Sequence, residues 1–531
     1  MQTKSERGIA LVLALFLVAA LSVLGASLMF LSQTETYSSM NYRMMSQARY
    51  AGEAGIQKAA NFLLDSSGTQ YILPTEAQLA ADYNYDVSPV TRKSNNSPVI
   101  LSAINDACTG SNYPDAAMQT AFCNAAKGSL TAYNASISYH TSAKLLAMQS
   151  FDSYESGKVV IQTWEITGDG TLTGSRSATV EVVATVETPK MPAYGYAAYG
   201  TSPGCASLTF QGNTGTDSYD PNGLTGNTVP APIGDGGDLG SNGNLKLTGN
   251  TIDIKGNLTT PRTGVGACSE GHLTAIDGNV NLLDSSKDVQ LPATMQFPTP
   301  TIPAFSPLPA VTKVDATTCA GLGLPITGTA AQVALGTAQC NVTGSTVTIN
   351  STGFLGTLPG VELKGSDSIV LIAGGPDPLS YNFNSLSLTA NATLGVSATG
   401  PTQGAILNFS GQDNTGTAIT SPKQVIDLEG GGFVGVTGCP ATCSAYDASM
   451  VQFVYGGTGL VTLTGHSGAA AAFYMPNANV TLQGNTALYG AVVAGTFTDA
   501  GNANLYYDAQ LAGSVYVKGN PIIGTFTWKR Y

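Results

Sequence analysis

The longest apolar run of the chain lies at its N-terminal end. Residues 8–34 carry no charged side chain, and a short polar head with Lys4 and Arg7 precedes them. Because a helix rises about 1.5 Å per residue, Ile9–Leu31 would extend over roughly 34 Å, enough to cross a hydrocarbon layer of about 30 Å. The pattern predicts one membrane-spanning helix whose basic head stays in the cytoplasm, so that the rest of the chain is exported.

Helix-forming residues continue beyond this run. They extend to Leu64, and the first proline is Pro74. Past Gln33, charged residues alternate at helical spacing with apolar and small residues. This pattern is typical of an amphipathic helix, in which the two kinds of residue lie on different faces. We therefore expect a single helix of about 84 Å over residues 9–64.

Two runs rich in β-branched residues follow, at Val159–Ile166 and Ala178–Val186. Gly168-Asp-Gly170 lies between them and predicts a turn, so the two runs are expected to form an antiparallel hairpin or meander. Residues 65–157 are poorly periodic. Together with the two strands they fill residues 65–190, between the helix and a change of composition near Lys190.

From residue 191 onward, short apolar triplets are punctuated by Gly-Asn. The phrase at Val461–Gly465 returns at Val480–Asn485 and Phe497–Asn502, and its glycines are 19 and 17 residues apart. A period of this size is typical of one turn of a parallel β-helix, in which Gly and Asn form the corners. The predicted fold class is therefore α+β, mostly β, with a β-solenoid over residues 191–531. An immunoglobulin-like sandwich is the alternative.

A proline-rich segment separates the two groups of repeats. Residues 292–309 contain six prolines. Such a segment is extended and semi-rigid. It would serve either as a spacer or as a buttress across the face of the solenoid.

The chain has eight cysteines, an even number, in a part expected to be exported. Disulfides are the usual state of such cysteines. Sequence neighbours suggest four pairs, although many other pairings are compatible with the sequence. The suggested pairs are Cys108 with Cys123, Cys205 with Cys268, Cys319 with Cys340, and Cys439 with Cys443.

Residues Arg7–Val12 (RGIALV) and Ala48–Ile56 (ARYAGEAGI) resemble the two signatures of PilX-type minor pilins of type IV pili. The resemblance covers the first 64 residues. It implies that prepilin peptidase cuts between Gly8 and Ile9 and removes the leader 1–8. It further implies single-pass insertion in the inner membrane, packing of the helix among other pilins, and display of the head on the pilus at the cell surface. Residues 65–190 would then form a small pilin-like α/β head whose sheet packs on the upper half of the helix.

One position departs from the general pilin pattern. Most pilins have a glutamate at the fifth mature position, which can neutralise the terminal amine of a neighbour, whereas this chain has Leu13. An unpaired ammonium group in hydrocarbon is costly. The similarity to pseudopilins that lack this glutamate implies a place at or near the filament tip.

The C-terminal part also shows a resemblance. The segment from Val361 to Asp508, with Gly490–Gly495 (GAVVAG) and Leu505–Asp508 (LYYD), is similar to a domain of unknown function that is often fused to PilX-like stems. This resemblance implies no chemistry of its own.

Candidate catalytic and metal-binding residues are sparse. His140, His272 and His466 are far apart in the sequence, so we predict no zinc site, and we predict no catalytic residue. Asp217, Asp220 and Asn222 form a weak calcium pattern, for which solvated turns are the simpler interpretation. A net charge of −12 argues against a nucleic-acid partner.

Clustered tyrosines were the remaining candidates for ligand contact. They could present stacking platforms to a glycan or a surface receptor, or they could belong to a domain seam or the solenoid core. They are Tyr194, Tyr196, Tyr199, Tyr506 and Tyr507.

The sequence therefore predicts a non-enzymatic minor pilin that acts in pilus assembly or adhesion. Two alternatives share its main features. One is a pseudopilin of a type II-like secretion system, and the other is a membrane-anchored β-helix enzyme that acts on polysaccharides.

Overall fold

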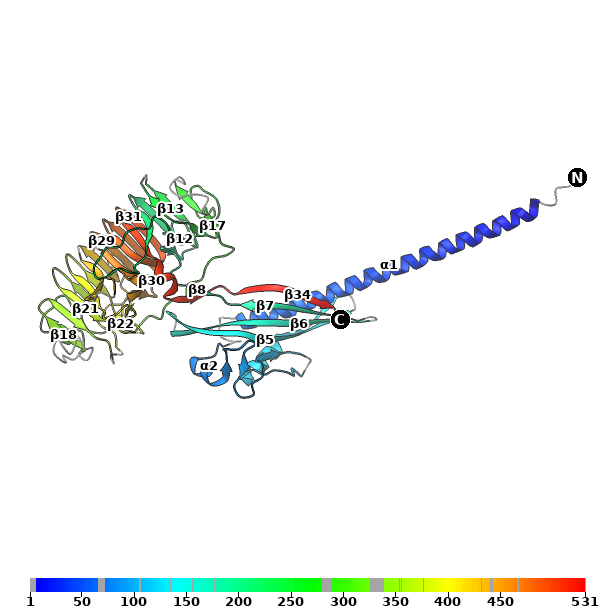
Figure 1. Cartoon of the computed structure of the whole chain (residues 1–531), viewed down its shortest axis with the longest axis horizontal. Coiled ribbons are helices and arrows are strands. Elements are labelled where there is room, and N and C mark those ends of the chain that lie inside the picture. Colours follow the sequence, from blue (N-terminus) through cyan, green and yellow to red (C-terminus); the bar gives the residue numbers. More distant parts are fainter. Residues whose placement is uncertain are drawn as a thin grey trace. The chain divides into compact units, whose positions relative to one another are not determined.

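The computed structural model describes residues 6–64, 72–104, 107–132, 135–154, 157–174, 177–249, 251–278, 288–324, 339–352, 354, 356–375, 377–430, 432–439, 443–465 and 468–530. The chain forms two compact units (Figure 1). Unit 1 consists of Met1–Ser150, Val160–Pro189 and Pro521–Tyr531, and unit 2 of Phe151–Val159 and Lys190–Asn520. Each unit has its own hydrophobic core.

Helix α1 (Glu6–Leu64) dominates unit 1 and confirms the long apolar N-terminal helix. Its outer half buries one face against a six-stranded sheet whose main order is β3-β5-β6-β7-β34. The pairs within this sheet are antiparallel, as expected. The elements of unit 1 besides α1 are α2 (Glu76–Asp82), β1 (Tyr83–Asn84), β2 (Thr91–Arg92), β3 (Ile100–Ser102), α3 (Ala116–Ala125), β4 (Lys127–Ala132), β5 (Ala135–Ser153), β6 (Gly157–Thr173), β7 (Ala178–Glu187) and β34 (Ile522–Arg530).

The turn predicted at Gly168-Asp-Gly170 is wrong, because β6 runs through all three residues. The two glycines instead let α1 approach the sheet closely. A Cβ atom on Gly170 would lie 1.8 Å from the carbonyl oxygen of Ala48, and one on Gly168 would lie 2.5 Å from that of Gly52. Any larger residue at these positions would collide with the helix backbone. The glycines thus set the distance between helix and sheet.

Unit 2 is mostly β. Its first strands are β8 (Lys190–Pro192), β9 (Ala198–Gly200), β10 (Leu208–Gly212), β11 (Gly215–Tyr219), β12 (Leu239–Ser241), β13 (Leu245–Thr248), β14 (Asp253–Ile254), β15 (Leu258–Thr260), β16 (Ile276–Gly278) and β17 (Asp288–Gln290). After the proline-rich segment come α4 (Thr318–Gly321), β18 (Cys340–Thr343), β19 (Thr346–Ile349), β20 (Val361–Leu363), β21 (Ser368–Ile372), β22 (Leu379–Phe383), β23 (Leu386–Leu388), β24 (Thr393–Ser397), β25 (Ala405–Phe409), β26 (Ile426–Gly430) and β27 (Phe433–Thr437). The last elements are η3 (Ala448–Met450), β28 (Val451–Tyr455), β29 (Leu460–Gly465), β30 (Gly468–Gly484), β31 (Ala487–Gly501), β32 (Asn504–Asp508), η4 (Ala509–Gly513) and β33 (Tyr516–Lys518).

Most strands of unit 2 pair in parallel with strands one repeat away, whereas β18 pairs antiparallel with β19 and β8 with β33. For example, β20, β23, β26 and β29 form one continuous column. The same register continues through β30, β31, β10, β13 and β16. Apolar residues align along this column and are buried. They are Val361, Leu386, Ile426, Val461, Val480, Phe497, Leu208, Leu245 and Ile276.

The order of the strands in space differs from their order in the sequence. Strand β31, near the C-terminus, pairs in parallel with β9 and β10, which come early in the unit. Strands β9 to β17 therefore continue the stack after β31 (Figure 1). The chain enters the unit at β8 and leaves by β33, and these two strands pair antiparallel. Entry and exit are therefore adjacent.

The C-terminal strand departs from the predicted domain boundaries. The sequence places residues 521–531 in the C-terminal domain, but β34 pairs with β7 and belongs to unit 1. Strand β34 covers the edge strand β7, whose backbone groups would otherwise lack partners on that side. This hydrogen bonding, and not closeness in the sequence, decides to which unit the C-terminal strand belongs. Unit 2 also includes Phe151–Val159, the tip of the β5–β6 hairpin.

The proline-rich segment lies along unit 2 and is held by two asparagines. The side-chain amide of Asn242 donates to the carbonyl of Met295 and accepts from its N–H, both at 2.8 Å. Asn384 does the same with Ser306, at 2.8 and 2.7 Å. Each amide thus replaces the backbone partner that an extended segment would find in a sheet. This geometry corresponds to the buttress rather than to the spacer.

The Gly-Asn phrases form a corner of unit 2. Gly212, Gly484 and Gly501 have φ of 93°, 85° and 85°, a region that favours glycine. The asparagines after them form a ladder, in which Asn213 donates to Asn502 and Asn502 to Asn485, each at 3.0 Å. The repeated dipeptide therefore marks the bend of successive strands.

Replacing Asn502 with alanine removes both side-chain bonds of this ladder. We expect a loss of about 1 kcal/mol in the free energy of unfolding, because the bonds are exposed to solvent. Thermal or urea unfolding of the protein measures this difference. Gln483→Ala, an exposed position of β30, is the matched control. Equal stability of the two variants would show that the ladder contributes nothing.

Four disulfides join the cysteines in the pairs that sequence neighbours suggested. Their Cα atoms are 5.6–5.8 Å apart. One bond lies in unit 1 and three lie in unit 2. The bonds join Cys108 to Cys123, Cys205 to Cys268, Cys319 to Cys340, and Cys439 to Cys443.

Candidate functional site

The N-terminal part of α1 is the largest exposed apolar surface among the described residues. The large hydrophobic residues between Ile9 and Leu31 are 56–72 % exposed. By length and composition this helix can cross a membrane. A surface of this size on a soluble monomer is rare and marks a contact with lipid or protein.

Polar groups inside the apolar run are satisfied within the helix. The hydroxyls of Ser22, Ser27 and Thr34 each donate to a carbonyl four residues earlier, at 2.8 Å. In hydrocarbon every polar group needs such an internal partner. The run can therefore be surrounded by apolar groups without leaving these hydroxyls unpaired.

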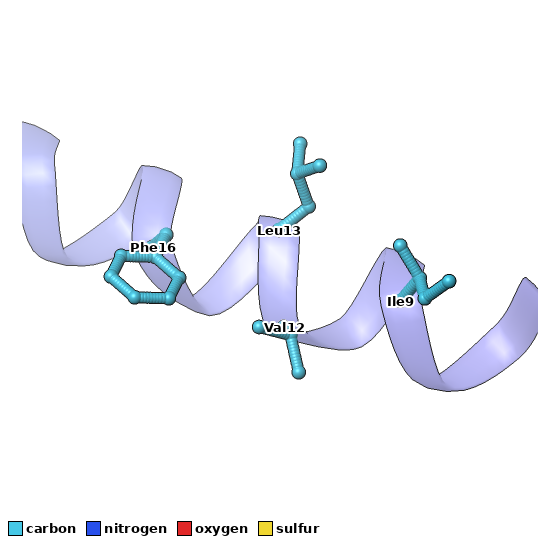
Figure 2. A pocket seen from close by; sticks show the side chains of 4 residues that line it. All are labelled: Ile9, Val12, Leu13 and Phe16. Atoms are coloured by element: carbon cyan, nitrogen blue, oxygen red, sulfur yellow. The ribbon is translucent and has the colours of Figure 1, made fainter.

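The predicted cleavage site lies at the beginning of this helix. Gly8 and Ile9 both fall within α1, while residues 1–5 lie outside the described part of the chain. Ile9, Val12, Leu13 and Phe16 line a shallow pocket on the helix, and Figure 2 shows their side chains projecting outward from the ribbon. The side chains that line this pocket together with Leu13 are all apolar.

The outer half of α1 contacts the sheet through small residues. Ala48, Ala51 and Ala59 are fully buried. Gly55 packs against Tyr139 and Thr141 of β5, where an added Cβ would lie 2.8 Å from the Thr141 methyl group. The N-terminal part of α1 is therefore exposed and apolar, whereas its C-terminal part is packed against the sheet.

Two of the three candidate calcium ligands, Asp217 and Asp220, accept hydrogen bonds from nearby backbone groups. A carboxylate oxygen of Asp217 accepts from the backbone N–H groups of Ser218 and Gly234, and one of Asp220 accepts from that of Asn222. These bonds stabilise turns, which is the simpler of the two interpretations. Within the described residues no cluster of three or more His, Cys, Asp or Glu is suited to a metal ion. His466 lies outside the described residues.

The tyrosines proposed as stacking platforms are mostly interior. Tyr194, Tyr199 and Tyr507 are buried in the core of unit 2, so for these three the platform interpretation is wrong. Tyr196 is half-buried and packs on Tyr199 with ring centres 5.2 Å apart. Tyr506 is half-buried and stacks on Tyr489 at 4.9 Å, so one of its faces is covered.

Sequence reasoning missed two buried carboxyl groups in unit 2. Asp508 accepts from the N–H groups of Ala448 and Gln510 and so holds η3 and η4 together, and burial raises its pKa to about 7. Asp499 is fully buried and its two oxygens have no hydrogen-bond partner. Burial raises the pKa of Asp499 well above its usual value. The recurring phrase Val-Thr-Leu reads Phe-Thr-Asp at residues 497–499, so Asp499 takes the place of the leucine. This difference was the available signal in the sequence.

Two protein families match parts of the chain. The PilX N-terminal family matches residues 7–57, and a domain of unknown function, DUF7305, matches residues 384–514. Comparison with curated proteins found no match. Among solved structures, the competence-associated pilin ComZ from Thermus thermophilus is similar at 15% identity and a TM-score of 0.23, over 92% of this chain and 98% of that chain. This similarity is too low to support an argument about the fold. Residues 7–57 of this protein are thus similar to the PilX N-terminal family, and the rest of the chain lies outside that match.

Proposed function

We propose that the protein is a minor pilin, a component of type IV pili that prepilin peptidase processes before assembly. The observation that carries this proposal is the single helix α1. Its first part is bare and apolar, its second part is packed on a sheet, and the PilX N-terminal family matches both parts. A helix of this kind can be held first by a membrane and later by other helices, which supports association with other pilins.

Processing explains why the apolar run begins at Ile9. Removal of residues 1–8 takes away Lys4 and Arg7, which hold the head on the cytoplasmic side. The mature helix then begins with an uncharged run that can leave the inner membrane. The leader and its removal belong to this proposal.

Replacing Gly8 with aspartate is expected to block the cut and leave the leader attached. N-terminal sequencing of the protein from its native cells should give Ile9 for the unaltered chain and Met1 for the variant. Gly25→Ala is the matched control, because an added Cβ there meets no atom within 4 Å. A mature N-terminus other than Ile9 in the unaltered chain would overturn the proposal.

A place at or near the filament tip is the second part of the proposal. Leu13 supplies no carboxylate to a neighbour's terminal amine, and the surrounding surface of α1 is apolar. An unpaired terminal ammonium group in hydrocarbon is costly. A subunit at the tip has no further subunit above it whose terminal amine it would have to neutralise. Immunogold labelling of sheared pili should place the protein at one end; labelling spread evenly along the shaft would contradict it.

The head is proposed to be a parallel β-helix displayed on the cell surface for adhesion or for assembly initiation. Its support is the parallel register of successive strands and the Gly-Asn corner. The adhesin interpretation implies a glycan or surface receptor as partner. Incubation of the whole protein with a glycan panel tests it, because turnover would favour the membrane-anchored enzyme and binding alone would favour the adhesin.

A pseudopilin of a secretion system would share the same helix. The PilX match favours the pilus over the secretion system, and it favours a structural over an enzymatic role. Deletion of the gene in its native cells separates the two, because a pilin affects twitching and a pseudopilin affects secretion.

A further inference from the structure

A polar pocket of about 350 Å³ lies on unit 2 beside the proline-rich segment. Its volume is near the lower end of the range of roughly 300–1,000 Å³ that is usual for small-ligand sites. Four of its ten lining residues are apolar, and the other six have hydroxyl or amide side chains. These six are Thr201, Asn242, Thr294, Gln296, Thr299 and Asn477. The pocket therefore offers hydrogen bonds to a small ligand from segments far apart in the sequence.

The corner that carries Thr201 is built from equivalent positions of neighbouring strands. Met475, Ala494, Gly200 and Ser241 pair in register across β30, β31, β9 and β12. The residues directly after them, which are Pro476, Gly495, Thr201 and Asn242, therefore occupy corresponding places. Residue 495 has no side chain, and the Thr201 hydroxyl donates across it to the carbonyl of Pro476. The glycine thus lets side chains from alternate strands meet at this corner.

The opposite wall is a short piece of the proline-rich segment, Thr294–Thr299, which we call the strap. Asn242 holds the strap by its two hydrogen bonds to the backbone of Met295. The hydroxyl of Tyr474 donates to the carbonyl of Pro298 at 2.9 Å. The wall is therefore ordered before any ligand arrives. A ligand that binds such a preformed wall loses less free energy to the ordering of the protein.

The strap also brings an aromatic ring to the pocket. Phe297 lines the pocket and is half-buried. Its ring centre lies 4.6 Å from that of Tyr199 and 6.5 Å from that of Tyr474, so core tyrosines fix its position. A fixed aromatic ring packs against the C–H groups of a ligand, while amides and hydroxyls around it both donate and accept hydrogen bonds. A saccharide presents this combination of C–H groups and hydroxyls.

The charge of the surroundings disfavours ionised ligands. None of the ten lining residues is charged. Arg262, a nearby cation, donates to the carbonyl of Pro203 at 2.9 Å and is not among the lining residues. The chain as a whole has a net charge of −12, which repels anions. A neutral ligand fits this environment better than an acidic one.

A second polar pocket of unit 2 lacks these features. It has a similar volume, about 370 Å³, but Asp377 contributes a carboxylate to it. No aromatic residue is among the described residues that line it. Of these two pockets, only the one beside the strap combines an aromatic ring with an uncharged polar lining.

We propose that the pocket beside the strap binds a neutral saccharide, such as the terminal unit of a surface glycan. The inference rests on the proposed adhesin role of the head and names its ligand class and its site. In this site Phe297 contacts the C–H groups of the sugar ring, and the amides and hydroxyls bond to its hydroxyl groups. Asn242 is a positioning residue, because its own hydrogen bonds hold the wall.

Binding of the full chain, purified in detergent, to immobilised glycans tests the ligand class. The panel contains glycans that end in neutral hexoses or N-acetylhexosamines and glycans that end in sialic or uronic acids. Binding should be confined to neutral termini, and the free neutral sugar should compete for it. Preference for acidic termini, binding to the protein part of glycoproteins after deglycosylation, or no binding to any glycan would each overturn the inference.

Two variants locate the site. Phe297→Leu removes the ring but keeps apolar bulk in the strap, and it should weaken binding on the order of tenfold. Gln296→Glu places a carboxylate at an exposed position of the lining and should weaken binding by a similar factor without lowering the thermal stability. Gln483→Glu makes the same change at an exposed position of β30 outside the pocket, and it should bind like the unaltered chain. Equal affinity of Gln296→Glu, Phe297→Leu and the unaltered chain would show that the sugar binds elsewhere.

The pilin function and the saccharide site fail in different ways. If the mature chain does not begin at Ile9, the pilin function fails whatever the glycan panel shows. If the chain begins at Ile9 and occurs in pili but binds no neutral glycan, the pilin function stands and the saccharide site is rejected.

Discussion

Replacing Gly170 with valine should lower the free energy of unfolding of unit 1 by about 3 kcal/mol or more. The Cβ of residue 170 would lie 1.8 Å from the carbonyl oxygen of Ala48 and 2.6 Å from the backbone nitrogen of Gly52. Both atoms belong to the helix backbone, which cannot move aside as a flexible side chain does. The helix must lift from the sheet, and its buried alanines then lose their contacts.

Hydrogen exchange of the full chain in detergent measures this effect locally. Amides of the outer half of α1 should exchange faster in Gly170→Val than in the unaltered protein. Thr167→Val is the matched control, because it places the same side chain on β6 at a position facing away from the two glycines. Unchanged exchange in Gly170→Val would mean that α1 does not cross β6 at these glycines.

Replacing Asp499 with leucine should raise the free energy of unfolding of unit 2 by about 2 kcal/mol at neutral pH. Asp499 stands in an inward row between Leu482 and Phe210, both of which are buried. Its carboxyl group has no hydrogen-bond partner, so burial is costly whether or not it is ionised. Leucine restores the residue type found in this row on the neighbouring strands β29 and β30.

The pH dependence of stability gives an independent check. Burial raises the folded-state pKa of Asp499, so the folded state holds its proton more tightly than the unfolded state. The contribution of this group is therefore fully present below its usual pKa of about 4 and is lost as pH rises through the folded-state pKa. Asp508 acts in the same direction between pH about 4 and about 7.

Unfolding of Asp499→Leu and Asp499→Asn at a series of pH values tests both effects. Each variant should lose the part of the pH dependence that Asp499 causes, and only leucine should also add stability. The part of the pH dependence that Asp508 causes should remain in both variants. A pH profile of Asp499→Asn identical to that of the unaltered chain would show that Asp499 does not titrate as expected.

The sequence by itself determined the features that depend on local periodicity. Residues 9–64 are an uncharged run followed by an amphipathic one, both rich in helix formers and free of proline, so the position of α1 followed from them. The Gly-Asn phrases likewise predicted a repeated corner, because few residues other than glycine enter the left-handed region at low cost. The β6–β7 pair followed from its β-branched residues. The signatures at Arg7–Val12 and Ala48–Ile56 predicted the match of residues 7–57 to the PilX N-terminal family.

Tertiary structure decided every feature that depends on partners distant in the sequence. Two glycines one residue apart are found both in turns and in strands that pack closely against a helix. For Gly168 and Gly170 only the contact with α1, which is absent from the local sequence, decides between these two structures. Tyr194 and Tyr507 belong to tyrosine clusters of the kind that can form an exposed stacking surface, yet in the folded protein both side chains are buried. Stacking of β31 on β10, and pairing of β34 with β7, join residues hundreds of positions apart. Because the free energy of such contacts depends on edges and surfaces that exist only after folding, no pattern along the chain records them.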